Sequence, residues 1–328
     1  FALALNRHKD HKLVRYIISL CGFSFVIPSI LIVFSVIKIF GYNGILNSYF
    51  NFYDLFSIKS IYGLKAILIA HVLLNTPFAT RLFVQNLNTI PRNYYEISES
   101  INLNFLGNIF KLEIPIIKQS LFAVFSIIFS LCFLSFAIVM ALGGSPKNST
   151  LEVAIFQYAL FDLNFNKAII LSFIQIFICI TFVLIGFYNF KGSNFFEVGN
   201  IKFKHPHKNK KLIQYIDYFL ILFFIIVLFS PIFVIYNEFL KSIFLKANLT
   251  STFIHAFKNS ILISLLTGII ISIFGLLISY LIVINYKNFI FQKLLLLTSS
   301  MILIISPIIF SLCYFIFFQP IINYPYIK

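Results

Sequence analysis

The sequence predicts an all-α, polytopic membrane protein. Of its 328 residues, 60% are hydrophobic and only 11% are charged, so the chain has more apolar surface than one soluble core could bury. The apolar residues form continuous runs near or above the roughly 20 residues that a helix needs to cross the hydrocarbon layer. A β-barrel would instead show alternating segments of about ten residues.

Seven apolar runs are long enough to be transmembrane helices. They occupy residues 14–40, 62–86, 117–142, 168–190, 212–236, 253–284 and 294–318. The loops on one side are the richer in cations, among them Arg7, Arg92 and Lys111. Because short cytoplasmic loops retain Lys and Arg, we expect the loops at 87–116, 191–211 and 285–293 to be cytoplasmic. These topology determinants also account for the net charge of +15, so we expect no nucleic-acid partner.

Polar side chains within apolar spans usually face protein or water, because they are costly in lipid. The second span contains His71 and Asn75, which share one face of a helix because they are four residues apart, and Pro77 follows them. Gln175 occupies a similar place in the fourth span. These three polar residues could line a translocation path. The other interpretation is hydrogen bonding between helices, with a proline kink in the second span.

Signatures of an enzyme or a metal site are missing from the sequence. The four cysteines are isolated, each within an expected span, so we expect them to pack in the core: Cys21, Cys132, Cys179 and Cys313. His205 and His207 lie in a basic segment without further ligands for a metal. The chain contains no P-loop, G-x-S-x-G or H-E-x-x-H motif. We therefore expect no enzymatic activity, no metal and no cofactor, and any energy source must come from another protein.

The polar stretch "YYEISESINLNFLGNIFKLEIP", residues 94–115, lies between the second and third spans. It resembles the cytoplasmic loop of permease subunits of binding-protein-dependent ABC importers, whose pattern is E-A-A, three residues, G, nine residues and I-x-L-P. The matching positions are Glu96, Ile97, Ser98, Asn102, Leu112, Ile114 and Pro115. Both alanines are replaced, and Asn stands in place of Gly. Asn tolerates the left-handed backbone that the Gly would adopt, so the turn can survive.

The flanking segments 25–47, 71–91 and 132–175 are similar to the thiamine and thiamine pyrophosphate permeases of ABC importers. These belong to a double-length permease group that also contains ferric-iron permeases. The resemblance implies a type I ABC importer permease-like helical bundle. Residues 1–190 would be a first permease half without its first two helices, with a coupling loop at 92–116. Residues 191–211 would be a basic cytoplasmic linker, and residues 212–328 the start of a second half, truncated before its own coupling loop.

The function that the resemblance implies is mechanical. The chain would be a multi-pass permease of the bacterial inner membrane, importing thiamine or thiamine phosphates, with membrane lipid around it. Its loop would dock on a cytosolic ABC ATPase dimer, with Glu96 setting the register, so that ATPase closure tilts the attached spans. The outer loop at 143–165 could receive a periplasmic solute-binding protein.

Three other functions stay open. The first is a ferric-iron ABC importer permease, from the same double-length group. The second is an ion-coupled secondary carrier, although the near absence of acidic residues from the spans argues against a carboxylate relay. The third is a membrane-embedded enzyme or scaffold.

Overall fold

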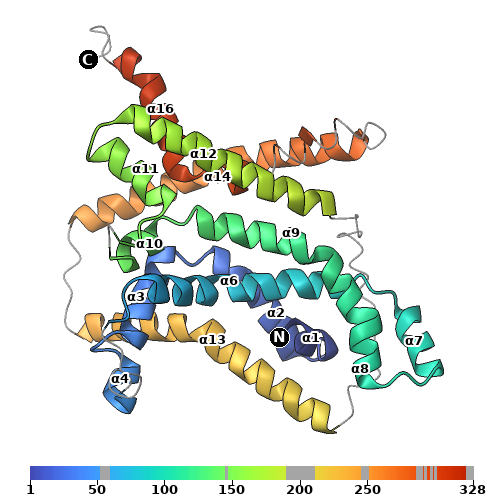
Figure 1. The fold of residues 1–328 in the computed structure, drawn as a ribbon. Helices are drawn as coiled ribbons and strands as arrows, with labels where there is room; N and C mark the ends of the chain where they lie inside the picture. Colours follow the sequence, from blue (N-terminus) through green and yellow to red (C-terminus); the bar gives the residue numbers. More distant parts are fainter. Residues whose placement is uncertain are drawn as a thin grey trace.

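The computed structural model describes residues 1–51, 60–144, 147–189, 211–244, 251–285 and 301–322, and single residues 291, 294, 295 and 298. These parts of the chain form helices and turns and contain no strand (Figure 1). The all-α class is therefore confirmed. Most of the basic linker, including His205 and His207, lies outside the described residues.

The helices follow one another in the order shown in Figure 1. Before the polar loop they are α1 (Ala2–Arg7), α2 (Lys12–Leu20), the 3-10 helix η1 (Cys21–Phe25), α3 (Ser29–Phe40), α4 (Ile45–Phe50) and α6 (Leu64–Leu87). The loop contains α7 (Arg92–Ser100), α8 (Phe105–Asn108) and the π-helix η2 (Ile109–Glu113). Then come α9 (Ile114–Phe133), α10 (Ala137–Leu142), α11 (Leu151–Leu160), α12 (Phe165–Asn189), α13 (Lys211–Phe244), α14 (Ser251–Ile284), the 3-10 helix η3 (Met301–Leu303) and α16 (Pro307–Ile322).

Within the described ranges, six helical segments are long and apolar enough to cross a membrane. They are Ser29–Phe50, Leu64–Leu87, Phe105–Phe133, Phe165–Gly186, Lys211–Lys241 and Thr252–Ile284. The first expected span is interrupted before Pro28, because proline lacks the N–H that a continuing helix needs, and α3 begins after it. The last expected span is represented by α16, which begins at Pro307 and has 16 residues.

The third expected span differs from the prediction at both of its ends. It begins earlier, because α8, η2 and α9 form one helical segment that starts at Phe105. It also ends earlier, at Phe133, where the chain turns into α10. Ile138, Val139 and Leu142 of α10 are buried in a cluster with α3 and α6. Hydropathy alone cannot separate these packed residues from a continuing span.

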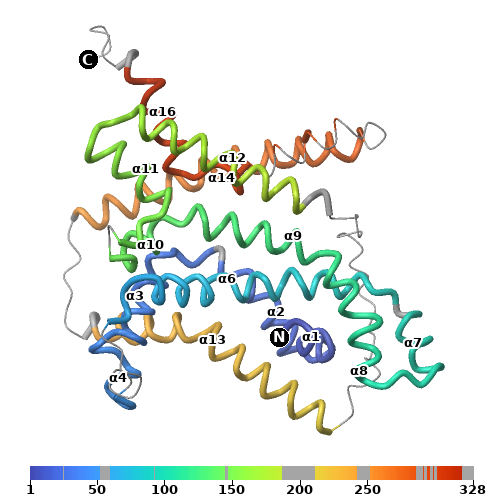
Figure 2. Tube along the Cα trace, viewed as in Figure 1, coloured from blue at the N-terminus to red at the C-terminus, as the bar shows by residue number. Residues whose placement is uncertain are grey.

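The long helices form a bundle in which segments distant in sequence are neighbours. Figure 2 shows α6, α9 and α12 running side by side. On the other side of α6, α13 packs on α1 and α3, which precede it by about 200 residues. The polar loop with α7 and α8 lies at one end of α6 and α9, and α10 lies at the other end (Figure 1). Most side chains of α14 are apolar and almost all are exposed, as expected for a helix that lipid or further membrane helices cover.

Small residues allow α9 and α12 to approach closely. A Cβ atom added to Gly186 would lie 2.6 Å from Oγ and 2.8 Å from Cβ of Ser126. Nearby, the rings of Phe129 and Phe182 stack with their centroids 3.9 Å apart. Small residues are typical of helix interfaces in membranes, because they let the two backbones pack closely.

Gly186→Ala should therefore destabilise the protein by about 1–3 kcal/mol, because the new methyl group overpacks the contact with Ser126. The check is the melting temperature of the detergent-solubilised protein. Adding Ser126→Gly to Gly186→Ala removes the clashing atoms and should recover part of the loss. An unchanged melting temperature for Gly186→Ala would contradict this close packing.

Candidate functional site

The polar loop is a helix, a sharp turn and a second helical arm. After α7, the backbone enters the left-handed region at Asn102, with φ of 51°. The N–H of Leu103 donates to the Ser98 carbonyl at 2.9 Å, which closes the turn. The Asn104 side chain then caps α8 by accepting from the Gly107 N–H at 2.8 Å. The left-handed backbone expected at Asn102 is therefore present.

The short helix α7 has a buried face and an exposed face. Tyr95 and Ser98 are buried, and the Ser98 hydroxyl donates to the Tyr95 carbonyl at 2.7 Å. Glu96 and Ile97 are exposed. At about 100° per residue they point away from the buried pair, whereas Glu99 lies to the side of Tyr95. The two positions that match the family alanines thus have opposite roles, since Ser98 packs inward and Ile97 points outward.

The exposed face of α7 is unusually apolar for a loop between spans. Tyr94, Ile97 and Ile101 are 54%, 57% and 62% exposed. We call these three residues and the exposed Glu96 of the same helix the α7 surface. Exposed apolar patches with a polar rim are typical of protein interaction sites.

The remaining motif residues lie on the returning arm. Leu112 belongs to η2, and Ile114 and Pro115 begin α9. Leu112 and Ile114 are half-buried and Pro115 is exposed. Proline lacks an N–H and its ring would clash with an α-helical carbonyl four residues earlier. The π turn before Pro115 accommodates it, so the helix continues into the membrane.

A buried cluster of charged groups holds the loop against the bundle. The Arg7 guanidinium donates to both carboxylate oxygens of Asp217, at 2.9 and 2.6 Å, although the two residues are 210 positions apart. His8 Nε2 lies 3.1 Å from the same carboxylate. The Glu113 carboxylate lies 4.0 Å from the Arg7 guanidinium. The cluster thus joins α1, η2 and α13.

Tyr95 connects α7 to this cluster. Its hydroxyl lies 3.4 Å from Oε1 of Glu113 and donates to that carboxylate. Burial and the neighbouring Glu113 carboxylate raise the pKa of the Tyr95 hydroxyl well above its usual range, so it stays protonated as a donor. The Arg7 guanidinium also stands over the Phe105 ring of α8, 5.1 Å from its centroid. The returning arm therefore contacts Arg7 directly, through Phe105 and Glu113, whereas α7 is linked to it through the hydrogen bond between Tyr95 and Glu113.

The sequence analysis missed the charged cluster. It interpreted Arg7 as a topology determinant only, but the side chain is buried at 5% exposure. One signal was available, because Asp217 is an acidic residue within the expected span 212–236. Its partner could not be identified from the sequence, since the contact depends on how α13 packs against α1.

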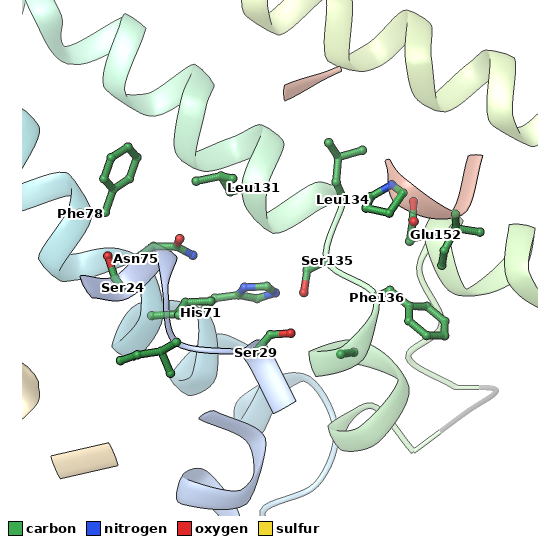
Figure 3. A pocket seen from close by; sticks show the side chains of 15 residues that line it. Ser24, Ser29, His71, Asn75, Phe78, Leu131, Leu134, Ser135, Phe136 and Glu152 are labelled. Carbon is green, nitrogen blue, oxygen red and sulfur yellow. The ribbon is translucent and has the colours of Figure 1, made fainter. Parts of the chain in front are cut away.

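The expected translocation-path residues surround a cavity at the other end of the bundle. His71 and Asn75 line this cavity, whose volume is about 400 Å³, together with Glu152 of α11 (Figure 3). Gln175 is fully buried behind it and donates to Oε2 of Glu152. Asn75 also donates to Cys132 Sγ at 3.3 Å, so it makes a contact between helices as well.

Glu152 is a second residue that the sequence analysis missed. It lies in the segment 143–165, interpreted as an outer loop, in which the structure forms α11. The side chain of Glu152 is fully buried, between α12 and the start of α16. The local sequence contains no sign that this carboxylate would be enclosed.

Comparisons with known proteins identify the family of the chain. The family described as "Binding-protein-dependent transport system inner membrane component" matches residues 1–191. The chain is similar to the "Thiamine transport system permease protein ThiP" of Haemophilus influenzae, with 34% identity over 236 residues, which is 71% of this chain and 43% of that protein. ThiP of Salmonella typhimurium is 34% identical and ThiP of Escherichia coli 32% identical, each over 52% of this chain and 32% of the relative. The chain thus spans less than half the length of these relatives. No solved structure matches the chain.

Asp217→Asn should destabilise the protein strongly, because it removes the nearer anionic partner of the buried Arg7 guanidinium and leaves only Glu113, at 4.0 Å. Removing one member of a buried pair costs about 3–5 kcal/mol. Thermal unfolding in detergent, followed by intrinsic fluorescence, measures the change.

Glu238→Gln is the matched control, because it makes the same chemical change on the same helix. The Glu238 carboxylate pairs with Lys38 at 3.1 Å, but their side chains are 39% and 51% exposed. An exposed pair contributes about 0–1 kcal/mol. Equal melting temperatures for the two variants would show that the buried pair is not essential to the fold.

Proposed function

Since the chain belongs to the family of binding-protein-dependent transport system inner membrane components, we propose that it forms the membrane channel of an ATP-driven importer for thiamine or its phosphates. It is a multi-pass protein of the bacterial inner membrane. The names of its relatives support thiamine as the solute. The α7 surface supports the ATP-driven part of the proposal, because it exposes apolar side chains on a loop that hydrogen bonds hold against the bundle.

We propose that the α7 surface docks on a cytosolic ABC ATPase dimer. Ile97 and its apolar neighbours would fill a groove of the ATPase, and Glu96 would set the register through its charge. ATP hydrolysis is expected on that subunit and not on this chain. A periplasmic solute-binding protein would deliver the solute to the opposite end of the bundle.

The buried charged cluster gives this docking a mechanical consequence. A displacement of α7 would be carried by Tyr95 to Glu113, which lies directly before α9. It would also be carried through Arg7 to Asp217 near the start of α13. The ATPase could therefore tilt α9 and α13 together, as rigid helices, when its dimer closes.

The organisation of the chain is part of the same proposal. Residues 1–190 would form one permease half, with its coupling loop at 92–116. Residues 212–328 would contribute to a second half, and 191–211 would link the two. The contacts of α13 with α1 and α3 would then be contacts between halves.

Glu96→Arg should reduce co-purification of the ATPase by at least about tenfold, since an opposed charge in an interface costs more than about 1.4 kcal/mol. The measurement is pull-down of the ATPase with the solubilised permease. Glu99→Arg is the control, because it makes the same change on the flank of α7 and should have a smaller effect. Full co-purification with Glu96→Arg would remove this residue from the docking site.

A growth experiment tests whether thiamine is the transported solute. The gene that encodes this chain, expressed with its ATPase and its binding protein, should allow a thiamine auxotroph to grow at limiting external thiamine. The matched strain with an inactive ATPase should not grow. Failure to grow despite good expression, together with ATP-dependent uptake of ferric iron, would assign the protein to iron transport.

A further inference from the structure

The cavity at the end of α6 combines one carboxylate with aromatic and hydroxyl groups. Its walls come from α6, the start of α3, the link between α9 and α10, α11 and the start of α16. The volume of about 400 Å³ lies in the range of small-molecule sites, about 300–1,000 Å³. Figure 3 shows the imidazole of His71 pointing toward Ser135, and the ring of Phe136 near Glu152. The cavity therefore has the size and the mixed lining of a binding site for a small heteroaromatic molecule.

Glu152 is only partly satisfied within the protein. Gln175 donates to Oε2 and the Ser306 side chain also hydrogen-bonds the carboxyl group, whereas Oε1 itself has no well-formed bond among the described residues, and the side chain is fully buried. No ion pair with a Lys or Arg is formed by Glu152 within the same residues. A buried carboxylate without a cation is costly. A cationic solute would supply the missing partner.

The other groups in the cavity favour an organic cation. Phe78 and Phe136 line it and offer ring faces to a cationic heterocycle. His71 also has a buried Nδ1 without a partner, which could bond a heteroatom of the solute. The described lining contains neither Lys nor Arg, so a phosphate group would have no cation to bind.

Ferric iron fits this cavity poorly. Hard cations take several oxygen ligands, and Glu152 is the single carboxylate in the described lining. The described residues contain no group of three or more His, Cys, Asp and Glu able to hold a metal ion.

We propose that this cavity is the membrane binding site for the solute, that Glu152 is its cation-binding residue, and that it takes a heteroaromatic monocation without phosphate groups. This inference rests on the proposed function and narrows it, since thiamine carries a positive thiazolium ring and its phosphates add negative charge. During transport the carboxylate would hold the cation while the aromatic and hydroxyl groups orient it.

The direct test is ligand-dependent melting of the solubilised permease encoded by the whole gene, without ATPase or binding protein. Thiamine at millimolar concentration should raise the melting temperature by about 2 °C or more, because a ligand that binds only the folded state stabilises it. Thiamine pyrophosphate at the same concentration should raise it less. A missing thiamine shift, or an equal shift with pyrophosphate, would overturn the proposal, even where cells take up thiamine normally.

Glu152→Gln locates the site. The amide keeps the size of the side chain and can still accept from Gln175, so a purely structural role predicts an unchanged thiamine shift. We expect the shift to be lost, and thiamine uptake by the assembled importer to fall at least tenfold. Glu238→Gln, which removes an exposed carboxylate, should keep both the melting shift with thiamine and the thiamine uptake. If Glu152→Gln does not fold, the proposal is still tested by the unmodified protein, through the difference between its melting shifts with thiamine and with thiamine pyrophosphate.

Absence of thiamine uptake by the unmodified importer would contradict the proposed function. If the unmodified importer takes up thiamine normally, and the Glu152→Gln variant keeps both its thiamine-dependent melting shift and its uptake, only the cavity assignment is contradicted. The two failures are therefore distinguishable.

Discussion

The buried ion pair between Arg7 and Asp217 is the interaction on which the arrangement of the end of the bundle that carries the polar loop depends. A guanidinium at 5% exposure is stable only when nearby carboxylates balance its charge. Two oxygens of Asp217 accept from it, and Glu113 lies within 4.0 Å. These three residues belong to α1, α13 and η2. The need to balance one buried charge therefore holds together three elements that are far apart in the sequence.

The same constraint connects the loop to the cavity. Glu113 lies directly before α9, and Leu131 and Leu134, at the far end of that helix, line the cavity. The 20 residues of α9 span about 30 Å. In parallel, α6 leads from His71 and Asn75 to Asn88, which accepts from Lys9 next to the charged cluster at 2.8 Å. Two continuous helices thus link a surface suited to docking with a cavity suited to a small cation.

The buried carboxylates of the chain differ in what balances them. Asp217 and Glu113 share one internal cation, and they hold the structure together. Glu152 is held by an amide, with no Lys or Arg paired to it among the described residues. A charge that the protein does not balance is a reason to look for a ligand, whereas a balanced charge is sufficiently explained by the fold.

The helical membrane class, the position of most spans and the turn at Asn102 could all be predicted from the sequence. These features depend on local properties, namely hydropathy over about 20 residues and the left-handed backbone that Asn tolerates. Only the tertiary structure decided that Ser98 packs inward while Ile97 points outward, that residues 137–142 leave the third span, and that Arg7 pairs with Asp217. It also decided that Glu152 is enclosed beside Gln175. Burial and ion pairing depend on which helices become neighbours, and the local sequence does not identify the partner of a residue when the two are up to 210 positions apart.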